Sequence, residues 1–181
     1  MNGWPRTLSW SDFTSIPNPG PTELRALNGH PIVARVGLSI MFFIGNSPRV
    51  GDGTTFRSVD VRLQVNRLEY VPSRIPAGQE ARYLQHEQGH MDLMGLLARE
   101  LEVALLALRG SSSADLTVQA NSTVDQAVNS ARMYAINVPR RDCLYDRETN
   151  HGMNQPGQTR WNRLIAQNIA RSRESDFIFR T

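Results

Sequence analysis

The chain has 181 residues, of which 40% are hydrophobic and 20% charged, a composition typical of one globular domain, here residues 1–181. The net charge of +3 comes from 20 basic and 17 acidic residues that are interspersed, and neither a phosphate-binding glycine loop nor a basic run with aromatics occurs. We therefore expect no nucleic-acid partner. The longest apolar stretch, residues 31–45, contains Arg35 and is too short to span a bilayer, so we expect no membrane span.

The compartment stays open at this level. Residues 1–6 lack the charged and apolar segments of a secretion signal, which leaves the cytoplasm, a trimmed secreted or periplasmic form, and an assembled particle as alternatives. Cys143 is the single cysteine, so no internal disulfide forms. We expect Cys143 to be a small, semi-buried side chain.

The first half of the chain has the pattern of β-structure. Residues 8–13 predict a short strand or turn, and residues 31–44 predict an apolar strand. Apolar and polar residues then alternate from Val59 to Val65, which indicates a strand with one wet face. Residues 45–53 between the last two segments have loop composition, so an antiparallel hairpin is expected.

The second half predicts helices. From Gln79 to Arg109 there is no proline, and leucines and a methionine recur at three- and four-residue intervals, which indicates one long amphipathic helix. Two more helices are expected at residues 116–138 and 158–171. The sequence therefore predicts an α+β fold with a small N-terminal antiparallel sheet, a long helix that carries the active site, and C-terminal helices.

The predicted long helix contains the motif HExxH, at His86-Glu87-Gln88-Gly89-His90. Two histidines four residues apart share one helical face and can bind one zinc ion, and the intervening glutamate can act as the general base of a peptidase. Gly89 costs about 1 kcal/mol relative to alanine within a helix, which is understandable where a metal or a neighbouring group must come close.

A catalytic zinc has three protein ligands and one open position, so a further ligand is needed. His151, in a polar stretch between predicted helices, is our first candidate, and His30, in a turn before the first long strand, is a weaker one. Carboxylates can also complete such a site. The competing carboxylates are Glu148, Asp146, Asp125 and Glu102.

Three blocks of the sequence resemble a bacterial family of zinc-dependent peptidases of the zincin class, known as a domain of unknown function. Residues 8–13, LSWSDF, are similar to its L-x-W-x-D-F opening, and residues 86–99 are similar to its HEQGHFD…AR segment, with Met91 in place of an aromatic residue. Its YD-x-x-T-x-HG…Q-x-x-W tail matches Tyr145, Asp146, Thr149, His151, Gly152, Gln158 and Trp161. The resemblance implies a zincin-like fold with one Zn²⁺ per chain.

These residues predict a zinc metallopeptidase that cleaves a peptide or protein substrate. A zinc ion on His86, His90 and His151 would activate a water, and Glu87 would take its proton and pass it to the leaving amine. Tyr145 is the first candidate for the oxyanion donor, with Arg147 or Arg141 behind it; an aromatic anchor of the loop is an equal alternative for Tyr145.

Supporting roles follow for several other residues. Asp92 is a candidate partner of a ligand imidazole. The aromatic side chains are expected to anchor the core or loops, and these are Trp10, Phe13 and Trp161. The resemblance also makes residues 59–65 the candidate sheet edge for substrate.

Two other classes of function stay open. One is an inactive or structural zincin-fold component of a homo-oligomer or larger assembly, and the other is a metal-free interaction module. Glu87 argues against both, because a structural site has no use for a base beside its first ligand.

Overall fold

The computed structural model describes the chain except residues 1–3, 19–31, 46–48, 51–52, 139–140 and 172–181. The strands are β1 (Thr14–Ser15), β2 (Ala34–Ile44), β3 (Arg49–Val50), β4 (Gly53–Thr54) and β5 (Val59–Tyr70). The α-helices are α1 (Glu80–Ala107), α2 (Ser113–Tyr134), α3 (Leu144–Thr149) and α4 (Gln155–Ala170), with short 3-10 turns at Trp10–Asp12 and Pro72–Arg74. The predicted α+β class is confirmed.

The main sheet has the strand order β1-β5-β2. Strands β2 and β5 form the predicted antiparallel hairpin, which pairs from Ala34↔Tyr70 to Ile44↔Val59. The sheet as a whole is mixed, because β1 runs parallel to β5, so the prediction of an antiparallel sheet is wrong in this part. A strand of two residues has no periodicity that the sequence could reveal.

A β-bulge between Gly37 and Leu38 of β2 places an additional residue in β5. The extra residue changes the phase of the alternation, so that both Val65 and Leu68 pack on the core side although they lie three residues apart. The bulge thereby keeps both parts of this strand of 12 residues packed on the side of the sheet that contacts α1.

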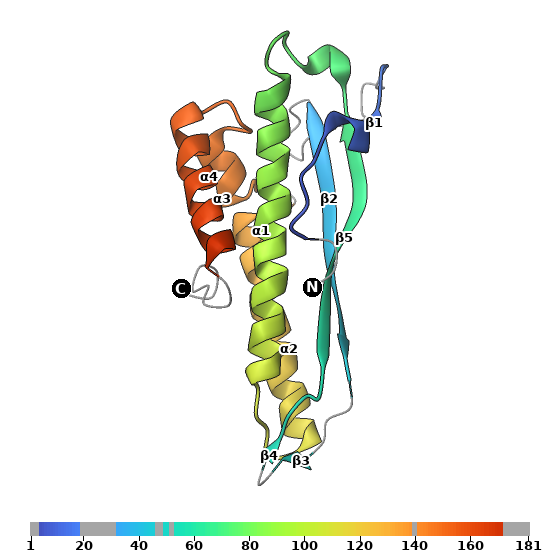
Figure 1. Ribbon diagram of the computed structural model, residues 1–181, viewed down its shortest axis with the longest axis vertical. Coiled ribbons are helices and arrows are strands. Elements are labelled where there is room, and N and C mark those ends of the chain that lie inside the picture. Colours follow the sequence, from blue (N-terminus) through green and yellow to red (C-terminus); the bar gives the residue numbers. More distant parts are fainter. Residues whose placement is uncertain (1–3, 19–31, 46–48, 51–52, 139–140, 172–181) are drawn as a thin grey trace.

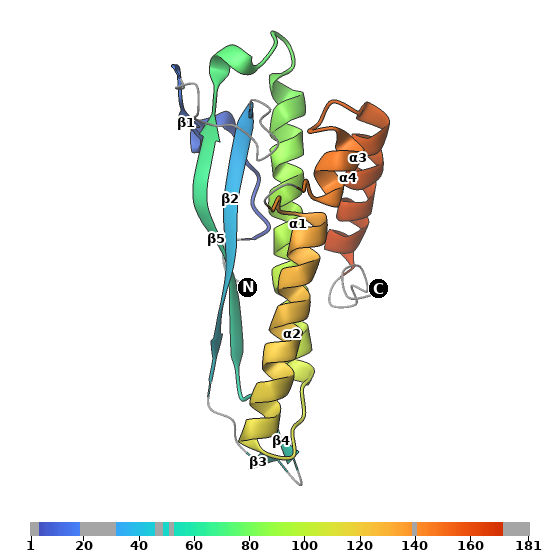
Figure 2. The ribbon, with the colours of Figure 1, turned by 180° about the vertical axis from the view of Figure 1, so that it is seen from behind.

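Helix α1 is the long predicted helix and forms the axis of the molecule. The main sheet lies on one side of it and helices α3 and α4 on the other, while α2 runs along its C-terminal half (Figures 1 and 2). Its 28 residues correspond to about 42 Å at 1.5 Å per residue. None of the described helices is long and apolar enough to cross a membrane.

The other helices differ from prediction in extent. Helix α2 ends at Tyr134 instead of residue 138, and α3 was expected to be part of a polar loop. A helix of six residues is too short to show a clear period. Both differences matter for the site, because the end of α2 and helix α3 each contribute a group to it.

The predicted aromatic anchors pack as expected. Phe13 and Trp161 are buried in the core cluster around the middle of α1, and Trp10 packs against it. Cys143 is more deeply buried than predicted, with 1% of its surface exposed.

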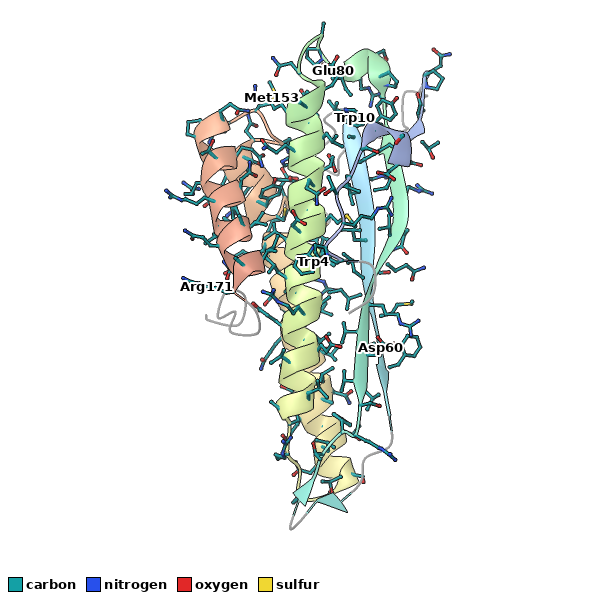
Figure 3. All side chains as sticks on the ribbon, viewed as in Figure 1. Trp4, Trp10, Asp60, Glu80, Met153 and Arg171 are labelled. Carbon is teal, nitrogen blue, oxygen red and sulfur yellow. The ribbon has the colours of Figure 1, made fainter. Side chains whose placement is uncertain are left out.

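Trp4 docks the N-terminal segment on α1 (Figure 3). Its indole N–H donates to Asp92 at 3.0 Å, and the guanidinium of Arg99 lies over its ring at 5.8 Å. A β-carbon at Gly95 would overlap the indole. Gly95 therefore permits the close approach of Trp4 to the helix backbone.

We expect Gly95→Ala to lower the free energy of unfolding by up to about 2 kcal/mol. Alanine gains about 1 kcal/mol in helix propensity, but overpacking against Trp4 costs about 1–3 kcal/mol, and urea unfolding measures the balance. In a Trp4→Ala background the same substitution is expected to stabilise the protein. Destabilisation of equal size in both backgrounds would contradict this account.

Candidate metal centre

The HExxH histidines meet a carboxylate from α3. The Nε2 atoms of His86 and His90 lie 2.9 and 2.8 Å from the same oxygen, Oδ1 of Asp146. All three residues are largely buried, with side-chain exposures of 4%, 13% and 3%. Asp146 was only an alternative ligand in the sequence analysis, yet it is the carboxylate on which both imidazoles converge.

The other nitrogen of each imidazole faces an oxygen. Nδ1 of His90 lies 2.8 Å from the carbonyl oxygen of Ala135, directly after α2. A carbonyl oxygen only accepts hydrogen bonds, so Nδ1 of His90 carries a proton. Nδ1 of His86 lies 3.3 Å from Oε1 of Gln158. Such outer contacts orient the imidazoles of metal sites.

Asp146 is also held by a residue other than the two histidines. Its second oxygen, Oδ2, accepts a hydrogen bond of 2.7 Å from the side-chain amide of Asn137. The amide oxygen of Asn137 in turn accepts from the backbone N–H of Cys143 at 2.7 Å. The carboxylate therefore presents Oδ1 to the histidines while Oδ2 is fixed from behind.

The pKa values in this cluster move in opposite directions. Burial raises the pKa of Asp146, but the two imidazoles outweigh it and hold this pKa well below its usual range. Burial lowers the pKa of His90, yet the charge of Asp146 raises it to about 9. Burial lowers the pKa of His86, which leaves it neutral at pH 7. The site thus holds one buried anion and attracts a cation, either a proton or a metal ion.

Two groups of donor atoms lie close enough together to hold a metal ion. Ligand atoms of His86, Asp146 and His151 lie within 4.8 Å of one another, as do those of His90, Cys143 and Asp146. Asp146 belongs to both groups. Two imidazoles and one carboxylate form a donor set that is common in catalytic zinc sites.

Glu87 is buried beside this cluster, with 5% of its surface exposed. Burial raises its pKa to about 7, and two opposing effects, the charge of His90 and a hydrogen bond from the backbone N–H of Val36, are smaller. Val36 lies in β2, which is an edge strand of the main sheet and has β5 on one side only. The described sheet edge nearest to Glu87 is therefore β2, whereas the edge expected from the sequence was residues 59–65.

Tyr145 lies behind the histidines and is fully buried. Its ring stacks on that of His86 at 4.8 Å between centroids, and its hydroxyl donates to the backbone carbonyl of His86 at 3.0 Å. A β-carbon at Gly89 would overlap this hydroxyl. A glycine is therefore needed at position 89 because Tyr145 of α3 approaches the helix backbone there. In this arrangement Tyr145 supports His86, and its hydroxyl is directed at the helix backbone.

His151 lies at the exposed side of the cluster, with 45% of its side chain exposed. Its Nδ1 is 3.6 Å from Oδ2 of Asp146, and its Nε2 is 3.6 Å from Asp142. Asn150 and His151 have positive φ angles of 48° and 50°, followed by Gly152 at 81°. Such consecutive left-handed residues are costly and are typical of functional sites.

Arg82 fixes the turn that carries His151. Its guanidinium donates to the carbonyl oxygens of Gly152, at 2.5 Å, and Met153. Arg82 lies one helical turn before His86 on α1, so the same helix holds both the ligand pair and this turn.

The remaining candidates lie away from the cluster. Glu148 accepts hydrogen bonds from Arg160 and Trp161, and Asp92 accepts from Trp4 and Gln88 rather than from a ligand imidazole. Exposed side chains are those of Asp125, Arg141 and Arg147. Glu102 is three turns further along α1 than His90. His30 lies outside the described residues.

The sequence analysis missed the outer contacts of the site. Ala135 and Asn137 had no role in it, and Thr149 and Gln158 entered only through the family resemblance. An oxygen that accepts from an imidazole has no characteristic spacing in sequence, and Ala135 uses its backbone. Of these four, only Gln158 and Thr149 carried a signal, since both belong to the resembling tail.

Comparisons with known proteins found no match to the chain. No protein-family model matches the chain, and neither a curated protein nor a solved structure shows significant similarity to it. The resemblance therefore depends on the three sequence blocks, and the function has to be argued from the site.

We expect zinc binding at pH 7 to release about one proton from His90. A zinc ligand must be a neutral imidazole, while the pKa of His90 in the metal-free protein is about 9. The apparent affinity should rise about tenfold per pH unit between pH 7 and 9. Calorimetry in buffers of different ionisation enthalpy counts the protons, and the Glu87→Gln variant removes any contribution from that carboxyl. Binding without proton release would show that His90 is already neutral.

Proposed function

We propose that the protein is a zincin-like, zinc-dependent metallopeptidase in which His86, His90 and Asp146 bind the metal and Glu87 is the general base. The observation that carries the proposal is the convergence of both HExxH imidazoles on Oδ1 of Asp146, at 2.9 and 2.8 Å, beside a buried glutamate. A helix that merely presented polar residues to solvent would not bury these groups together.

Asp146 replaces His151 as the favoured further ligand. A buried carboxylate needs a cation or donors nearby, and Asp146 is nearly inaccessible, whereas His151 is 45% exposed. We assign His151 to the solvent side of the site. There it can face the substrate and donate to the developing oxyanion, the role first considered for Tyr145.

Glu87 has the properties of a general base. When bound, zinc would lower the pKa of a water and polarise the substrate carbonyl. The carboxylate of Glu87 is then the proton acceptor, and a pKa of about 7 in the metal-free protein suits proton transfer in both directions. The hydrogen bond from Val36 holds the carboxylate next to the edge of β2, along which an extended peptide substrate could lie.

Cys143 favours a second candidate function, a structural zinc site. Its sulfur lies within 4.8 Å of ligand atoms of His90 and Asp146. A site with four protein ligands is closed to water and substrate. If Cys143 were the fourth ligand, the protein would be a structural zincin-fold component rather than an enzyme.

We expect about one zinc per chain in the purified protein. Elemental analysis should show its loss in His86→Ala and Asp146→Ala, but its retention in His151→Ala and in the control Asp142→Asn. Loss of zinc in His151→Ala alone would transfer the ligand role to His151. No zinc in the wild type after zinc is supplied would exclude the proposed function.

We expect Glu87→Gln to bind zinc normally and to lose peptidase activity by about a hundredfold or more, because the general base contributes about 10²–10⁴-fold. Activity is measured on unstructured protein substrates, with Glu80→Gln, an exposed glutamate of the same helix, as the matched control. Cys143→Ser should keep both zinc and activity. Loss of zinc in Cys143→Ser, with no activity in the wild type, would favour the structural site.

A further inference from the structure

We propose that residues 150–153 form a gate over the metal centre and that Arg82, which donates to two carbonyl oxygens of this turn, is the latch that holds the gate closed. The gate opens to admit the metal ion and the substrate. That a substrate passes through it rests on the proposed function, whereas the gate itself rests on the buried cluster alone.

The groups of the proposed site are shielded from solvent in this structure. The side chains of His86 and Asp146 are 4% and 3% exposed, and Glu87 is 5% exposed. A catalytic zinc needs an open position that water and substrate can reach, and a peptide is far larger than a water molecule. The arrangement is therefore a closed one, and a segment at its surface must move before a substrate reaches Glu87.

The turn at residues 150–153 covers this cluster. The backbone of Gly152 lies so close to His86 that a β-carbon on the glycine would be 3.1 Å from the β-carbon of His86. Nδ1 of His151 is 3.6 Å from Oδ2 of Asp146, while 45% of the His151 side chain is exposed. The turn thus has the buried site on one side and solvent on the other.

The conformation of the turn depends on contacts from outside it. Asn150 and His151 have φ angles of 48° and 50°, values that residues other than glycine seldom adopt. Such a conformation persists only where the surrounding structure enforces it. When an outer contact is released, these two residues are expected to return to more favourable angles, which changes the course of the backbone over His86.

Arg82 provides such an outer contact. Its Nε donates to the carbonyl oxygen of Gly152 at 2.5 Å, and its Nη2 donates to that of Met153. Its Nη1 donates to Oε1 of Gln79, at the start of α1, at 3.2 Å. Hydrogen bonds from a charged donor are about twice as strong as neutral ones. The guanidinium therefore ties the turn to the first residues of the helix that carries the histidines.

The latch lies at the surface, where it can be released. Met153 lies beside the first turns of α1 (Figure 3) and is 46% exposed, and the Tyr83 hydroxyl donates to its sulfur at 3.3 Å. Arg82 is itself half-buried, so water can replace its hydrogen bonds to the turn. The four gate residues belong to neither core cluster. The gate can therefore open while the core around α1 stays packed.

The test is Arg82→Gln, which removes the charge and the paired hydrogen bonds to the turn. Diethyl pyrocarbonate acylates accessible imidazoles, and mass spectrometry of the metal-free protein follows the labelling of each histidine. We expect His86 to be labelled about tenfold faster in the variant, the factor that the loss of one charge-assisted hydrogen bond corresponds to. His151 is exposed in the wild type and serves as the internal reference. Excess chelator should remove zinc from the loaded variant faster by a similar factor.

Arg99→Gln is the matched control. Arg99 lies on the same helix and also donates to two backbone carbonyl oxygens, those of Asn168 and Ile169, but these lie at the end of α4. This variant should change neither rate. Equal acceleration in both variants would show a general loosening of the fold and would overturn the proposal, as would unchanged labelling of His86 in folded Arg82→Gln.

Gly152→Ala leaves Arg82 in place and serves if Arg82→Gln does not fold. The φ angle of 81° at Gly152 disfavours alanine, and the added β-carbon would press on His86, so we again expect faster labelling of His86. Protection of His86 as in the wild type would contradict the gate. If the wild type binds no zinc, the proposed function fails, and the labelling of His86 still decides this inference.

Discussion

The approach of two imidazole nitrogens to one oxygen of Asp146 is the contact on which the rest of the site depends. Each helix contributes to it: α1 provides the histidines, α3 the carboxylate, the end of α2 a carbonyl oxygen for His90, and α4 the amide of Gln158. The spacing of the histidines is fixed by helical geometry. The position of the carboxylate depends on three other segments, and a shift in any of them would separate the donor atoms.

Electrostatics explain why this contact calls for a cation. An isolated buried carboxylate is strongly unfavourable, and Asp146 keeps its charge because His90 is protonated in the metal-free protein. Such a buried ion pair compensates only part of the cost of removing both charges from water. A divalent ion that displaces the proton would interact with the same three atoms. The metal-free and the proposed metal-bound states thus share one arrangement.

Close packing around α1 makes this arrangement possible. Gly89 admits the Tyr145 hydroxyl and Gly95 admits the Trp4 indole, so the helix is approached closely on two faces. One core cluster joins the main sheet, the middle of α1, α3 and α4, and a second cluster fills the space between the sheet, the C-terminal half of α1, and α2. The site lies beside the first cluster. The second cluster supports the length of α1 without contributing a ligand.

The sequence by itself determined the α+β class, the hairpin, the long helix and the HExxH pair, because each depends on a local period or spacing that side chains impose. It also indicated that the segment with Tyr145, Asp146 and His151 contributes candidate ligands and a candidate oxyanion donor. Only the tertiary structure decided which atoms of that segment meet the histidines: α3, too short to show a period, turns Asp146 inward and directs the Tyr145 hydroxyl at the helix backbone. Contacts such as Ala135 to His90 and Gln158 to His86 join residues 45 and 72 positions apart, and no local pattern in a sequence encodes such distances.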